Sequence, residues 1–109
     1  MRPAIHEPME IRKNITGDCH ELMVSGRIDG AGANTLEEVL LGTIRDGANP
    51  IYVNLAEVTF LCSAGLRVLM QYWRQMKNSQ RTLLVTRPSP DVEAVIETTG
   101  LKHLVVEAS

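Results

Sequence analysis

The sequence has no long apolar run and no large excess of charge of either sign. Stretches such as Val39–Leu41 and Val68–Met70 are far shorter than the about 20 apolar residues that cross a bilayer. The first residues lack the apolar segment of a secretory signal. Acidic and basic residues are interspersed and give a formal net charge of −2, whereas nucleic-acid phosphates favour a basic stripe. These absences predict a cytoplasmic protein that binds no nucleic acid and does not insert into a membrane.

Cysteine is scarce, and the few metal-ligating side chains are scattered. Cys19 and Cys62 lack the Cys-x-x-Cys spacing, and the three histidines do not complete a zinc pattern. His20 follows Cys19 directly, but neighbouring residues of a strand point to opposite faces, which disfavours a shared metal site. We therefore expect two free thiols in a reducing compartment, with no cofactor.

The order of apolar runs and turn signals predicts the fold class. With 109 residues, 44% hydrophobic and 22% charged, the chain has the composition of one globular domain covering residues 1–109. The expected elements are, in order, a hairpin over 9–25, a helix from about Ala33, a strand at Ile51–Leu55, a helix after Gly65 that reaches Asn78, a strand at Thr82–Thr86, a helix after Ser89, and a short strand at Val105–Val106. Helices that alternate with short buried strands are typical of a parallel sheet. The prediction is an α/β domain with a mixed, mostly parallel sheet, an antiparallel edge hairpin and three to four helices.

Several single residues carry local predictions. Gly32 is a permitted N-cap of the first helix, and Gly47 is placed to end it. Ser89, followed by Pro90 and an acid, is a strong helix start, and Gly100 fits a helix end. Two further side chains, Met23 and Trp73, are expected in the core.

Three motifs, in order, carry a family resemblance. The loop Gly26-Arg27-Ile28-Asp29 resembles the Gly-x-[Leu/Ile]-Asp loop of STAS domains, a family that includes bacterial anti-sigma factor antagonists. The segment Val58–Leu69, with Cys62-Ser63-Ala64-Gly65-Leu66-Arg67 inside it, resembles the phosphorylation segment of that family. The stretch from Pro90 to Leu101 resembles its closing helix and Thr-Gly-Leu turn. The resemblance runs from about Glu10 to Val106.

The resemblance implies a protein-interaction module and not an enzyme. Ser63 would accept a phosphoryl group from an anti-sigma factor that is also an ATP-dependent serine kinase, and a cognate phosphatase would remove it. The unphosphorylated form would bind the anti-sigma factor and free the sigma factor. The residues that the resemblance implies in partner binding are Asp29, Cys62, Ala64, Gly65, Leu66 and Arg67. Cys62 stands where many members of the family have an acid.

Elementary electrostatics gives Ser63 a similar role. Ser63 stands where a strand ends and a helix begins, so a phosphate there would meet the free N–H groups of the first helical turn. Ser63, Arg67, Gln71 and Arg74 share one helix face, and Arg67 is close enough to pair with the phosphate. The fold should tolerate this charge, whereas a partner interface fitted to a bare hydroxyl should not.

Other interpretations remain open at this point. Ser63 could be an ordinary helix cap, and Asp29 could bond the local backbone instead of a partner. The chain could be a STAS subunit of a lipid-transport ABC complex or a sensory STAS module that is not phosphorylated. Finally, Cys62-x-x-Gly65-x-Arg67 is similar to the active-site loop of rhodanese-type sulfurtransferases, in which the cysteine would carry sulfur.

Overall fold

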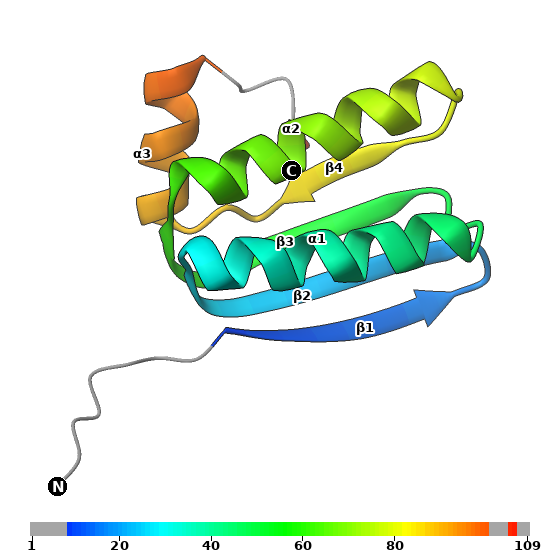
Figure 1. Cartoon of the computed structure of the whole chain (residues 1–109), viewed down its shortest axis with the longest axis horizontal. Helices are drawn as coiled ribbons and strands as arrows, with labels where there is room; N and C mark the ends of the chain where they lie inside the picture. The colour runs from blue at the N-terminus through cyan, green and yellow to red at the C-terminus, as the bar shows by residue number, and fades with distance from the viewer. Residues whose placement is uncertain (1–8, 101–104, 107–109) are drawn as a thin grey trace, which may run out of the picture.

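The computed structural model describes residues 9–100 and 105–106. Its elements follow in the order β1 (Glu10–Thr16), β2 (Cys19–Ile28), α1 (Gly30–Arg45), β3 (Ile51–Leu61), α2 (Ser63–Asn78), β4 (Leu83–Thr86), α3 (Pro90–Thr99) and β5 (Val105–Val106) (Figure 1). The strands lie in one sheet in the order β1-β2-β3-β4-β5. β1 is antiparallel to β2, and every other neighbouring pair is parallel. The predicted α/β fold, with its edge hairpin and three helices within the described residues, is confirmed.

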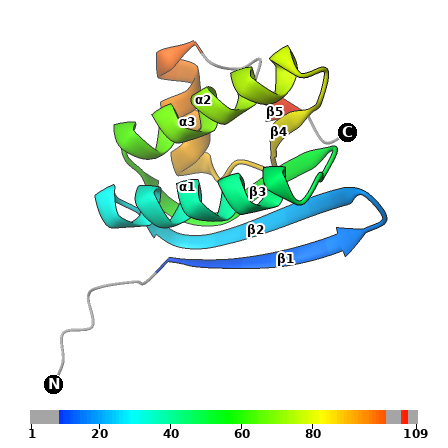
Figure 2. The same cartoon turned by 45° about the vertical axis from the view of Figure 1, so that its right-hand side comes forward.

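The topology places α1 and α2 on one face of the sheet. The connections from β2 to β3 and from β3 to β4 both move one position in the same direction, and right-handed crossovers then carry their helices to the same side. The two helices lie side by side over the sheet in both views (Figures 1 and 2). Beneath them, alternate strand residues form the buried core, including Leu22, Val24, Ile51, Val53, Leu83 and Val85.

The intervening strand residues form the opposite face, which we call the open face and define by Cys19, Glu21, Met23, Tyr52 and Thr86. All five are half-buried. The prediction that Met23 belongs to the core is therefore wrong. Because Leu22 and Val24 on either side of it face the helices, the two-residue period of a strand turns Met23 to the open face.

One buried contact ties α1 to α2. The Tyr72 hydroxyl donates to the Glu37 carboxylate at 2.8 Å. Burial raises the pKa of the Tyr72 phenol, and the hydrogen bond to Glu37 raises it further. The contact joins the two helices, while the buried apolar side chains of α2, such as Leu69 and Met76, pack it on the core. Trp73, the next residue, is half-buried and lies under the Lys77 ammonium at 4.8 Å, so it borders the core and is not enclosed in it.

The helix ends confirm three local predictions and correct one. Ser89 caps α3 by accepting a hydrogen bond from Val92 N, and Gly100 ends that helix in the left-handed conformation. Gly47, with φ of +87°, follows the last turn of α1. Gly32, however, is not an N-cap: α1 begins at Gly30, and Asp29 is its cap.

Candidate functional site

Two of the three sequence motifs meet at one edge of the sheet. Because β2 and β3 are parallel neighbours, Ile28 and Leu61 stand opposite each other where these strands end. Cys62 N donates to Ile28 O at 2.9 Å, which joins the loop after β2 to the start of α2. We call this the carboxyl edge. The Gly26–Asp29 loop and the Cys62–Arg67 segment therefore form one site, although 32 residues separate Asp29 from Cys62 in the sequence.

Ser63 is the first residue of α2, and its side chain is exposed. The N-cap is Cys62, in an extended conformation, and within the described part of the chain its thiol makes no hydrogen bond to the helix. The interpretation of Ser63 as the helix cap is therefore wrong. Side chains cap α1 and α3, by contrast, through Asp29 and Ser89.

The uncapped start of α2 is suited to an anion. N–H groups of the first turn have no partner inside the helix, and no acid occurs between Ser63 and Leu66 to compete for them. Arg67, Gln71 and Arg74 are exposed at the predicted spacing along α2. Arg67, Gln71 and Arg74 also line a shallow depression there, together with Met70, Gln75 and Asn78. A phosphate on Ser63 would thus meet main-chain donors and one side of a basic, polar helix face.

Gly65 lets α2 approach the ends of both strands closely. A Cβ at this position would lie 2.7 Å from Ile28 Cγ2 and 2.8 Å from Leu61 Cδ1. Gly65 is buried, as is Leu66, and Cys62 and Ala64 are half-buried. Among the residues implied in partner binding, Arg67 is the most open to solvent, while Gly65 and Leu66 seat the helix. A direct contact of either buried residue with a partner stays a prediction.

Asp29 bonds the local backbone. Its Oδ1 accepts a hydrogen bond from Gly32 N at 2.9 Å. Gly32 itself is buried, and a Cβ there would lie 3.0 Å from Arg27 O. One of the two interpretations of Asp29 is thereby observed. The carboxylate fixes the loop that leads from β2 into α1, and a role on the partner surface stays a prediction.

Sequence reasoning missed two residues of the carboxyl edge, Arg27 and Phe60. They stand opposite each other on β2 and β3, and the Arg27 guanidinium lies 4.2 Å from the centre of the Phe60 ring. Phe60 is 37% exposed. The sequence signal was weak, because an aromatic residue near the end of an apolar strand is normally buried.

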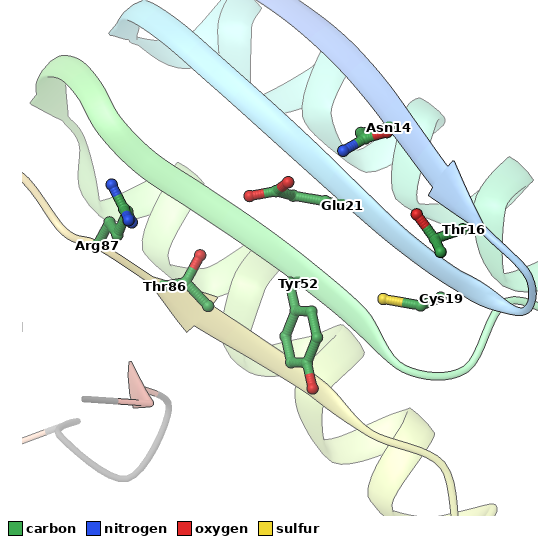
Figure 3. Close-up of a pocket in the computed structure, with 7 residues that line it drawn as sticks. All are labelled: Asn14, Thr16, Cys19, Glu21, Tyr52, Thr86 and Arg87. Carbon is green, nitrogen blue, oxygen red and sulfur yellow. The ribbon is translucent and has the colours of Figure 1, made fainter. Parts of the chain in front are cut away.

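A second depression, of about 310 Å³, lies on the open face away from Ser63 (Figure 3). Its lining comes from four strands and the residue after β4: Asn14, Thr16, Cys19, Glu21, Tyr52, Thr86 and Arg87. Glu21 accepts a hydrogen bond from Asn54 Nδ2 at 3.1 Å. Cys19 begins β2 whereas Cys62 follows β3. Because these strands are parallel neighbours, the two free cysteines lie at opposite ends of the strands.

Two features are absent from the part of the chain that the structure describes. No group of three or more His, Cys, Asp or Glu side chains there could hold a metal ion. Likewise, none of the described helices is long and apolar enough to cross a membrane.

Comparison with known proteins agrees with the geometry. The family model described as Mlab, STAS domain, matches residues 11–107. The chain is 33% identical to the anti-sigma-B factor antagonist of Staphylococcus aureus over 86 residues, which are 79% of this chain and 80% of the relative.

Two solved structures share the fold. An anti-sigma factor antagonist from Mycobacterium paratuberculosis superposes with a TM-score of 0.82 at 23% identity, covering 92% of this chain and 85% of the other. The Bacillus cell fate determinant SpoIIAA in its phosphorylated form gives 0.73 at 19% identity, covering 92% of each chain. With a family model that spans 11–107 and the family's two loop motifs joined at one edge of the sheet, the chain belongs to the STAS domain family.

Proposed function

We propose that this chain is an anti-sigma factor antagonist that works by partner switching, with Ser63 as the control point. One observation carries the proposal: Ser63 is exposed at the uncapped start of α2 on the carboxyl edge, where the two family motifs meet. The name of the Staphylococcus relative supports the class of partner, an anti-sigma factor. The proposal includes a cytoplasmic location, a kinase that uses ATP and a phosphatase that resets Ser63.

The arrangement would switch binding and leave folding intact. A phosphoryl group adds about −1.5 to −2 charges at neutral pH. At the start of α2 that charge is stabilised by about 0.3–2 kcal/mol, because it faces the positive end of the helix and lies one turn from Arg67. Burying the same charge under a partner fitted to a hydroxyl costs several kcal/mol, on the order of the penalty for an unpaired buried ion. Phosphorylation therefore opposes the complex and leaves the fold intact.

Phosphorylation by the partner is the direct test. We expect the purified anti-sigma factor of the same organism, with Mg²⁺ and ATP, to label the parent chain and to leave Ser63→Ala unlabelled. Ser79→Ala is the matched control, because Ser79 is an equally exposed serine at the other end of α2. Label should be followed by mass spectrometry of the peptide that contains Ser63. Label that persists in Ser63→Ala would contradict phosphorylation at Ser63. A parent chain that takes no label would contradict the kinase step. If that unlabelled parent still binds the anti-sigma factor, the chain is a STAS module that is not phosphorylated.

The thiol of Cys62 is dispensable in the proposed mechanism. Cys62→Ser keeps a small side chain at the N-cap and adds a good capping hydroxyl, so we expect unchanged binding of the anti-sigma factor and an equal or slightly higher melting temperature. The rhodanese-type alternative makes the opposite prediction. Sulfur transfer from thiosulfate to cyanide, measured for the parent and lost in Cys62→Ser, would establish that alternative and refute the non-enzymatic one.

A further inference from the structure

We propose that Arg27 and Phe60 form the specificity contact of the partner surface beside Ser63. The Phe60 ring enters an apolar cavity of the anti-sigma factor, and the Arg27 guanidinium binds a carboxylate at the rim of that cavity. This inference rests on the proposed function, since it assigns residues and a complementary chemistry to the same partner.

Phe60 is exposed at the carboxyl edge. Phe60, the single phenylalanine of the chain, is 37% exposed, and the described residues leave one other large hydrophobic side chain in solvent, Ile15 at 56%. Aromatic residues and arginine are enriched in protein interfaces relative to the rest of the surface. The exposed Phe60 ring, on the same edge as Ser63, is therefore suited to contact a partner.

The backbone that carries Arg27 and Phe60 is irregular. Pairing of β2 with β3 is irregular twice, between Met23 and Ser25 and between Gly26 and Arg27. The second shift makes Thr59 an extra residue on β3, so that Arg27 stands opposite Phe60. Gly26, with φ of +90°, supplies a conformation that other residues rarely adopt. Bulges of this kind re-aim side chains and are common beside functional sites.

Within the described residues, the Arg27 guanidinium has no acidic partner. It stacks on the Phe60 ring, and within the described residues this ring contact is the side chain's one interaction. A stacked guanidinium keeps the N–H groups of its edge free for a carboxylate, which it binds through two parallel hydrogen bonds. The nearby Asp29 accepts a hydrogen bond from Gly32 N, and within the described residues it forms no ion pair with Arg27. The partner chemistry that fits is an acid next to an apolar cavity.

The same contact would strengthen the response to phosphorylation. Ser63 follows Phe60 by three residues, and Cys62 N is bonded to Ile28, the neighbour of Arg27. A partner carboxylate held by Arg27 would therefore lie on the edge at which the phosphate appears. Like charges at such an edge repel, so the acid that favours the unphosphorylated complex also disfavours the phosphorylated one.

Titration calorimetry with the purified anti-sigma factor tests the assignment. We expect Phe60→Ala to bind about 10- to 30-fold more weakly than the parent, the range of an interface hot spot. Arg27→Glu should bind more weakly than Arg27→Ala, and Arg27→Ala should show a smaller loss of affinity with added salt than the parent does. Ile15→Ala is the matched control: it removes the other exposed hydrophobic side chain, on β1 beside the turn that leads into β2, and should bind within about twofold of the parent.

The outcomes separate this inference from the proposed function. Thermal melts establish that each variant is folded before its affinity is compared. If the parent binds and responds to Ser63 phosphorylation, while Phe60→Ala and Arg27→Glu bind like the parent, the inference is overturned and the proposed function stands. If Ile15→Ala weakens binding as much as Phe60→Ala does, the carboxyl edge is not special and the inference again fails. A parent that does not bind the anti-sigma factor contradicts both.

Discussion

The chain phosphorylated at Ser63 should bind the anti-sigma factor with an affinity at least about 10²-fold lower than that of the unphosphorylated chain, while the domain stays folded. An unpaired charge that becomes buried costs several kcal/mol, and each 1.4 kcal/mol is about a factor of ten in affinity. Ser63→Ala should bind at least as well as the parent and should not be released by ATP. Ser63→Asp should bind more weakly than the parent, but less so than the phosphoprotein, because it carries about one charge instead of two.

Calorimetry of the four forms against the anti-sigma factor measures this series, with thermal melts as the folding control. Ser63→Ala should melt like the parent, because Cys62 holds the N-cap position and the substitution removes no side-chain cap. The phosphorylated form and Ser63→Asp should melt at the same or a higher temperature, because their charge faces the positive end of α2. Arg67→Ala should change the melting temperature of the phosphorylated form more than that of the bare form, since its proposed ion partner exists only there. Equal affinities for serine, alanine and aspartate at position 63, with all three folded, would remove Ser63 from the mechanism.

Sequence patterns predicted the elements whose ends are marked by residues with strong local preferences. Ser89 and Pro90 begin α3 and Gly100 ends it, because a capping hydroxyl, a fixed φ and a residue tolerant of positive φ leave few alternatives. The start of α2 at Ser63 was predicted from the strand, the small residues after it and the family resemblance. These signals are local, so they survive without knowledge of the tertiary structure.

Features that depend on register between strands were not predictable. The strand expected at Ile51–Leu55 continues to Leu61, because pairing with β2 extends beyond the last residue paired with β4, Asn54. A one-residue slip exchanges the two faces of a strand, so the first register shift turns Val58 into the core and the second returns Phe60 to the open side. The cap of α1 was misplaced for a related reason: Gly30, Ala31 and Gly32 are all compatible with a helix start, and the Asp29 side chain decides among them.

Gly65→Ala should destabilise the domain by up to about 2 kcal/mol, although alanine is the better helix former. Alanine gains about 1 kcal/mol of helix propensity over glycine. Its Cβ, however, would come within 2.7 Å of Ile28 Cγ2 and 2.8 Å of Leu61 Cδ1, closer than carbon atoms approach without displacement. Ile28 is completely buried, and its β-branched side chain has little rotamer freedom with which to move aside. Overpacking of this kind typically costs about 1–3 kcal/mol and outweighs the propensity gain.

Urea unfolding of the parent, Gly65→Ala and Gly42→Ala measures the change in the free energy of unfolding and shows whether each substitution stabilises or destabilises the domain. Gly42 is exposed within α1, and a Cβ there would meet no atom within 4 Å, so the same substitution should stabilise by about 0.5–1 kcal/mol. Because Gly65 sets how the first turn of α2 lies against Ile28, the displaced helix should also bind the anti-sigma factor more weakly than its folded fraction accounts for. If Gly65→Ala were as stabilising as Gly42→Ala, α2 would not pack closely against the ends of β2 and β3. The position of Ser63 would then not be fixed by that packing.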